Sequence, residues 1–146
     1  AAAGIGAFLM GFVDDRIGSK KTILLSNLFL IIATIMVVST NDESIFWVAG
    51  IIVGFWSGPN QSASRSLMSK LSPKNKQNEF FGFFAFSGKI TAFLGPFLLA
   101  QTTYVALQYY NFEKASAQRL GVSVVLFLFI LGTFFLSLVN EDKDFK

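Results

Sequence analysis

Gly11-Phe-Val-Asp-Asp-Arg-Ile-Gly-Ser-Lys-Lys21 is a short charged stretch that separates two apolar runs of the sequence. Its two acidic residues and one arginine lie between Gly11 and Gly18, and its two lysines follow Gly18. Apolar sequence resumes at Thr22. A charged stretch this short between two apolar runs is typical of a tight turn between two membrane helices. It predicts a helical membrane protein.

The composition agrees with a membrane location. The chain has 146 residues, of which 53% are apolar and 14% are charged, whereas about a quarter of residues are charged in an average soluble domain. It contains no His and no Cys. This excludes an imidazole general base, a thiol nucleophile, a disulfide framework and a metal site built from imidazole or thiolate ligands. The sequence therefore predicts no metal site and no cofactor.

Four long apolar runs follow the charged stretch, and Lys89 is the only charged residue within them. Each has about the 20 residues that a helix needs to cross a hydrocarbon core of ~30 Å. Buried helices of a large soluble protein are the alternative, but these runs lack amphipathic outer faces, and they lack the alternation of β-barrel strands. The expected helices are 1–13, 22–40, 44–63, 80–100 and 120–139. Because 1–13 is too short to span, we expect it to be the end of a longer helix and the chain to be a fragment.

Basic residues in the connections predict the orientation. Nine of the twelve basic residues fall on one side of the expected helices: Arg16, Lys20, Lys21, Arg65, Lys70, Lys74, Lys76, Lys143 and Lys146. The other side holds the 41–44 connection, without a basic residue, and the 101–119 connection, with two. The positive-inside rule then places the basic side, including the C-terminus, in the cytoplasm. We expect a multi-pass protein of the plasma membrane of a bacterium.

The charged stretch resembles the loop signature of the major facilitator superfamily, Gly-x-x-x-Asp-Arg-x-Gly-basic-basic. Gly11, Asp15, Arg16, Gly18 and Lys20 fall on its positions, and Ser19 stands where a basic residue is usual. Three later blocks, 58–66, 79–96 and 119–121, narrow the resemblance to the vacuole-effluxer-like branch, which includes fungal vacuolar amino-acid effluxers and many bacterial proteins. It implies an all-α membrane protein: the C-terminal part of a twelve-helix fold, comprising the end of helix eight and helices nine to twelve.

The resemblance also implies that Gly11, Asp15, Arg16, Gly18 and Lys20 form a cytoplasmic gating loop. A carboxylate at Asp15 is suited to the positive N-terminal end of a neighbouring helix, with Arg16 or Lys20 holding it in place. The alternative is a solvated turn that only obeys the charge rule and contributes little energy. Asp14 is expected to face solvent.

A second candidate pair lies at the next cytoplasmic connection. Arg65 follows one apolar run and Glu79 precedes the next, so the two are expected to pair across the hairpin. The alternative partner of Arg65 is a lipid phosphate. The basic run 65–76 lacks interleaved aromatic residues, which argues against nucleic-acid binding.

Lys89 is the strongest candidate for a substrate or ion-pair residue. It lies about ten residues, or ~15 Å, into its expected helix, where a lysine costs on the order of 3 kcal/mol on insertion scales. Small residues share its helix face, so we expect it to point into a cavity. There it binds an anionic group of a substrate or pairs with an acidic residue in the missing half; a purely structural ion pair is the alternative.

One further pattern concerns packing. Gly50, Gly54, Gly58 and Ser62 recur at every fourth position, which lets a neighbouring backbone approach closely. A static contact and a sliding surface both fit this stripe.

Together these features predict a secondary active transporter of a small solute, with amino acids as the first candidates, working by alternating access. A membrane scaffold or regulator that kept the fold without transporting is the alternative. An enzyme is not expected, because Lys89 is the only charged group at membrane depth, and the absence of a P-loop gives no support to ATP hydrolysis. The expected partners are the lipid bilayer, the solute and the missing N-terminal half of the chain.

Overall fold

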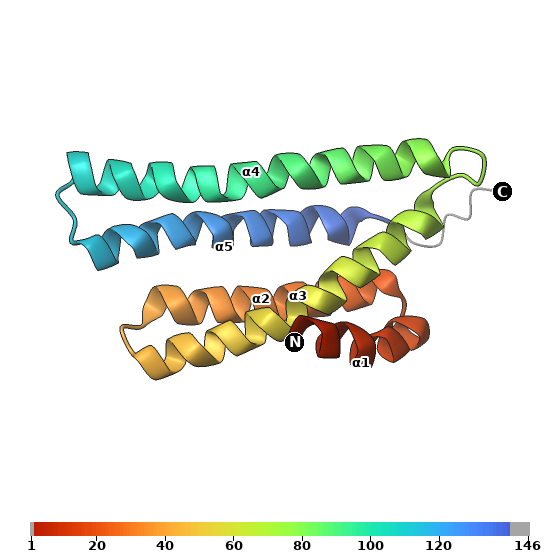
Figure 1. Ribbon diagram of the computed structural model, residues 1–146, viewed down its shortest axis with the longest axis horizontal. Coiled ribbons are helices and arrows are strands. Elements are labelled where there is room, and N and C mark those ends of the chain that lie inside the picture. The colour runs from red at the N-terminus through yellow and green to blue at the C-terminus, as the bar shows by residue number, and fades with distance from the viewer. Residues whose placement is uncertain (1, 141–146) are drawn as a thin grey trace.

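The computed structural model describes residues 2–140, which form five α helices joined by short connections (Figure 1). Their bounds are as follows: α1 Ala2–Ile17, α2 Ser19–Ser39, α3 Glu43–Leu71, α4 Gln77–Tyr109 and α5 Lys114–Leu138. Most of them extend beyond the apolar runs of the sequence. The expectation of an all-α protein is confirmed.

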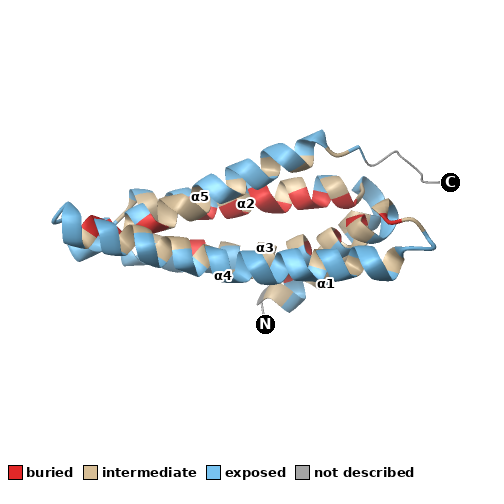
Figure 2. Ribbon diagram, turned by 90° about the horizontal axis from the view of Figure 1, so that it is seen from above, coloured by how far each residue is buried: buried red, intermediate tan, exposed pale blue. Residues whose placement is uncertain are grey.

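Helix α2 lies at the centre of the arrangement. It packs against both α3 and α5, while α1 packs mainly on α3, and α4 packs mainly on α5. Buried residues accordingly concentrate along α2, and exposed residues cover most of α4 (Figure 2). The order across the bundle is therefore α1, α3, α2, α5 and α4.

The antiparallel helices bring connections of like charge to the same end. The turn at Gly18 and the 72–76 connection lie at one end of the bundle, and the 40–42 and 110–113 connections lie at the other (Figure 1). The orientation predicted from the basic residues depends on these connections lying at the same end of the bundle. We refer to these as the basic end and the acidic end.

Length and composition qualify three of the described helices, α2, α4 and α5, to cross a membrane. The expectation also included the 44–63 run, but α3, which contains it, does not qualify on hydropathy. The physical reason is the low hydropathy of its glycines and of Ser57, Asn60 and Gln61. Helix α3 packs against both α1 and α2, so part of its surface is covered by protein.

Glycines bring α1 and α3 into backbone contact. A Cβ atom at Gly58 would collide with the carbonyl oxygen of Ala3, and one at Gly6 would collide with the carbonyl oxygen of Phe55. The Cβ atom added at Gly6 would also lie 3.2 Å from the Cδ atom of Pro59. Gly58 therefore serves the close packing expected of the four-residue stripe, whereas a Cβ at Gly50 would have nothing within 4 Å. Gly6 is a contact that the sequence did not indicate.

The core beneath this contact is built from small residues. Ile23 of α2 clusters with Ala63 and Leu67 of α3. Two buried hydroxyl groups of α2 donate to their own helix: Ser26 Oγ donates to Thr22 O at 2.8 Å, and Thr34 Oγ1 donates to Leu30 O at 2.7 Å. These bonds satisfy polar groups that would otherwise be costly away from water. Small buried side chains thus let α2 be enclosed by its neighbours.

We predict that Gly58→Ala reduces the stability of the full-length protein, because the added methyl group forces α1 away from α3. Overpacking of this kind typically costs about 1–3 kcal/mol. Gly50→Ala is the matched control in the same helix. Thermal unfolding in detergent measures both variants, and equal melting temperatures for the two would contradict the proposed backbone contact.

Candidate functional site

The charged stretch of the sequence forms a turn of one residue. Helix α1 ends at Ile17 and α2 begins at Ser19, so only Gly18 lies between them. Gly18 has φ 91° and ψ 150°, a backbone region open essentially to glycine alone. Its N–H donates to Asp14 O at 2.9 Å. The observed connection is therefore much shorter than the expected loop. Asp15 lies inside α1, and Lys20 lies in the first turn of α2.

The carboxylate that faces inward at this turn is Asp14. Its side chain is half-buried, whereas Asp15 and Arg16 are exposed, so the expectation that Asp14 faces solvent is wrong. The fully buried hydroxyl of Ser19 lies 3.4 Å from Asp14 Oδ2 and 2.9 Å from Ser66 Oγ. Within the described residues, Asp14 Oδ1 is buried without a hydrogen-bond partner.

Ser19 also ties the turn to the end of α3, because its hydroxyl accepts a hydrogen bond from Lys70 Nζ at 2.9 Å. No ion pair joins Asp15 to Arg16 or to Lys20 within residues 2–140. The gating role of Asp15 stays a prediction. The contacts that the structure shows at the basic end belong to Asp14, Ser19 and Lys20.

Lys20 and Arg119 cap each other's helices at opposite ends of the bundle. Lys20, at the start of α2, donates from Nζ to Ser137 O at 2.9 Å and to Val139 O at 2.6 Å, at the end of α5. Arg119, near the start of α5, donates from Nη2 to Thr40 O at 2.6 Å, at the end of α2. These carbonyls have no partner within their own helices, and a cation there also favours the helix dipole.

A chain of amide and hydroxyl groups crosses the bundle between these caps. Asn60 Nδ2 of α3 donates to Asn27 Oδ1 of α2 at 2.6 Å, and Asn27 Nδ2 donates to Thr133 Oγ1 of α5 at 3.0 Å. The sequence analysis did not single out these residues. Asn27 is the only carboxamide in the apolar run 22–40, and that was the available signal.

Lys89 and Arg65 line one groove between α3 and α4. The groove consists of two adjoining hollows of about 550 and 630 Å³, which share Arg65, Phe84, Gly88 and Ala92. Lys89 lines the larger hollow and Asn60 the smaller. The sequence placed these two cations at separate sites, and the structure brings them to the same one.

The expected pairing of Arg65 with Glu79 is not present among the described residues. Both side chains are exposed, and Arg65 lines the groove while Glu79 lies in the first turn of α4. Helix α3 continues to Leu71 and α4 already begins at Gln77. The two residues therefore lie within separate helices, on either side of the 72–76 connection.

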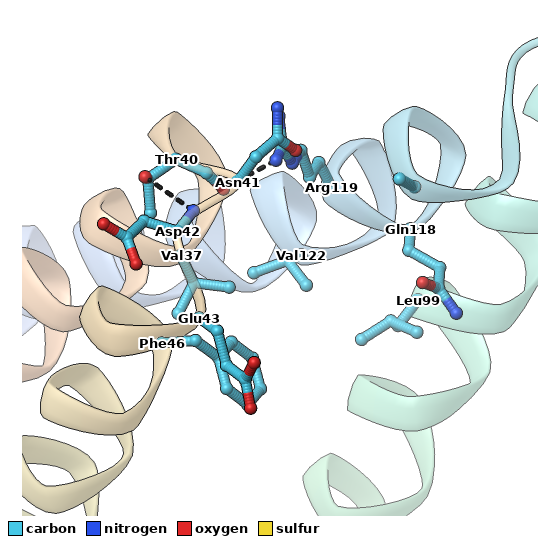
Figure 3. A pocket seen from close by; sticks show the side chains of 11 residues that line it. Val37, Thr40, Asn41, Asp42, Glu43, Phe46, Leu99, Gln118, Arg119 and Val122 are labelled. Atoms are coloured by element: carbon cyan, nitrogen blue, oxygen red, sulfur yellow. Dashed lines mark hydrogen bonds between the residues drawn. The ribbon is translucent and has the colours of Figure 1, made fainter.

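A second hollow, of about 470 Å³, lies at the acidic end, where Thr40, Asp42 and Arg119 meet the start of α3 (Figure 3). Two of its charged side chains, Asp42 and Arg119, already have partners. Asp42 Oδ1 accepts from Ser44 N at 2.8 Å as the N-cap of α3, and Arg119 donates to Thr40 O. This hollow is the junction of three helix ends, and the α3–α4 groove is the better candidate site.

Long apolar helices and glycine-mediated contacts between them define a multi-pass helical membrane protein. The family described as "Vacuole effluxer Atg22 like" matches residues 1–146. The chain belongs to this vacuole-effluxer-like family, as its sequence motifs predicted.

One curated relative supports the wider assignment to the major facilitator superfamily. The chain is 28% identical over 138 residues to "Uncharacterized MFS-type transporter YxiO" of Bacillus subtilis (strain 168). The match covers 94% of this chain and 30% of that protein, so the chain spans less than a third of the relative's length. No solved structure matches.

We predict that Lys20→Met destabilises the full-length protein by about 1–2 kcal/mol, because the last carbonyls of α5 lose a charged donor. Lys21→Met is the matched control, since Lys21 is adjacent and exposed. Thermal unfolding measures both. A melting temperature for Lys20→Met that equals that of the control would show that the cap contributes nothing.

Proposed function

We propose that the full-length protein is a secondary active transporter of a small solute that works by alternating access, and that it is not an enzyme. The observation that carries this proposal is the match of a transporter family across residues 1–146. The polar groove between α3 and α4 supports it, because a solute crossing a bilayer needs polar groups among otherwise apolar helices. Amino acids are the first solutes to test.

Transport is tested with purified full-length protein in proteoliposomes. Radiolabelled L-amino acids are offered with and without an imposed proton or sodium gradient, and empty liposomes serve as the control. Uptake or efflux above that control supports the proposal. A folded, monodisperse protein that moves none of a broad panel of amino acids, organic acids, sugars and amines would favour the alternative of a membrane scaffold.

We also propose that the protein resides in the plasma membrane of a bacterium with the basic end in the cytoplasm. A reporter that is active only in the cytoplasm is expected to give signal when fused after Lys146 and none when inserted after Asp42. The physical reason is the concentration of basic residues in the connections of that end. The opposite pattern of signals would reverse the orientation.

Asp15→Asn is predicted to lower the transport rate while leaving membrane abundance nearly unchanged. Asp15 is exposed in this chain, so its carboxylate is available to stabilise one conformation of the transport cycle and contributes little to packing. Asp14→Asn is the comparison, because Asp14 lies against the buried Ser19 and is expected to alter stability instead. Unchanged transport by Asp15→Asn would reduce the turn to a marker of orientation.

A further inference from the structure

We infer that the groove between α3 and α4 binds the anionic group of the transported solute, with Arg65 and Lys89 as its two cations. The inference rests on the proposed function and extends it to the chemical class of the substrate. A solute that carries a carboxylate fits the groove, and amino acids and organic acids belong to this class.

The two helices contribute different parts of the groove. Helix α3 supplies Arg65 together with the neutral polar residues Asn60 and Ser64, and α4 supplies Lys89. Between the two cations, Gly88 and Ala92 line both hollows. Small side chains at these positions leave room for a solute to approach both charges.

The charge of the groove is uncompensated within the described residues. Neither hollow has an acidic residue in its lining, and no hydrogen bond or ion pair to Arg65 or Lys89 occurs among residues 2–140. The other two cations with defined roles, Lys20 and Arg119, are bound to helix-end carbonyls. Cations at membrane depth favour a counter-charge, and an anionic solute supplies one.

The depth of Lys89 favours a solute over a lipid headgroup. Lys89 lies about 18 Å along α4 from Gln77 and about 30 Å from Tyr109, at 1.5 Å per residue. Headgroup phosphates lie at the membrane surface, outside a hydrocarbon core of ~30 Å. A soluble anion that enters the groove meets Lys89, which lines it.

One wall of the groove is held in place by the hydrogen bonds across the bundle. Asn60 is fixed by Asn27, which is in turn bonded to Thr133. Ser64 Oγ donates to Asn60 O at 2.7 Å within α3. The polar face of α3 is therefore ordered before a solute arrives, which reduces the entropy lost on binding.

The test uses a cysteine placed in the groove. Thr91 lines the smaller hollow and is exposed, and this chain contains no cysteine of its own. In full-length protein whose other cysteines have been replaced, Thr91→Cys is labelled with two methanethiosulfonate reagents, the anionic ethylsulfonate and the cationic ethyltrimethylammonium. The ratio of the two rates reports the local potential, because any change in thiol reactivity affects both reagents.

We expect the anionic reagent to be favoured, and the ratio to fall by about threefold or more in Lys89→Gln and in Arg65→Gln. Lys89→Arg keeps the charge and is expected to keep the ratio. Lys114→Gln is the matched control, since Lys114 is an exposed cation at the acidic end. A ratio that is unchanged in both glutamine variants, measured on protein with normal abundance and gel-filtration behaviour, would overturn the inference.

A second arm identifies the anion. A mixture of L-amino acids is expected to slow labelling of Thr91→Cys, whereas the corresponding amino-acid amides, which lack the carboxylate, are expected not to. Protection by neither mixture, or protection that appears only when phosphatidylglycerol is added to phosphatidylcholine vesicles, would overturn the assignment to a solute carboxylate. If the protein transports but its labelling does not depend on charge, this inference alone is contradicted. If labelling depends on charge and amino acids protect, but the protein does not transport, the proposed function alone is contradicted.

Discussion

The antiparallel pair of α2 and α5 is fastened at both ends by a cation from one helix on the final carbonyls of the other. Lys20 bonds to Ser137 O and Val139 O, and Arg119 bonds to Thr40 O. Helix ends leave unsatisfied carbonyls, and these are costly wherever water is scarce. Helix α2 has 21 residues and α5 has 25. Because one cap lies at each end of this pair, the two caps together fix how the helices are aligned along their length. The Asn27–Thr133 hydrogen bond holds the pair between its ends.

The remaining helices are attached to this pair in two different ways. On one side α3 packs along α2, and α1 contacts α3 through Gly6 and Gly58. On the other side α4 contacts α5 at Gly121, where a Cβ would lie 2.9 Å from Leu99 O. Helices α3 and α4 touch each other little, although they follow one another in the chain. The groove lies at this weakly packed junction.

The sequence was sufficient for the class of protein but insufficient for the partners of individual charges. Composition and apolar runs predicted a helical membrane protein, and Gly18 marked the turn because its backbone conformation is open essentially to glycine alone. Which of Asp14 and Asp15 faces inward depends on the rotation of α1. That rotation follows from the contacts of Gly6 and Gly58 with backbone of the opposite helix, between residues far apart in the sequence. The Arg65–Glu79 expectation paired the two residues across the hairpin between two apolar runs, whereas both residues lie in helices that extend beyond those runs. Sequence proximity therefore misassigned Arg65, and only the packing of α3 near α4 placed it with Lys89.

Basic residues have two different roles in this small bundle. A cation that caps a helix end is held there by backbone carbonyls that are part of the same fold. Lys20 and Arg119 are of this kind. Arg65 and Lys89 face a groove without carboxylates in its lining, so an anion that enters can bind there and leave again. A transporter requires such reversibility, because a permanent ion pair of equal strength would hold the site closed to its solute.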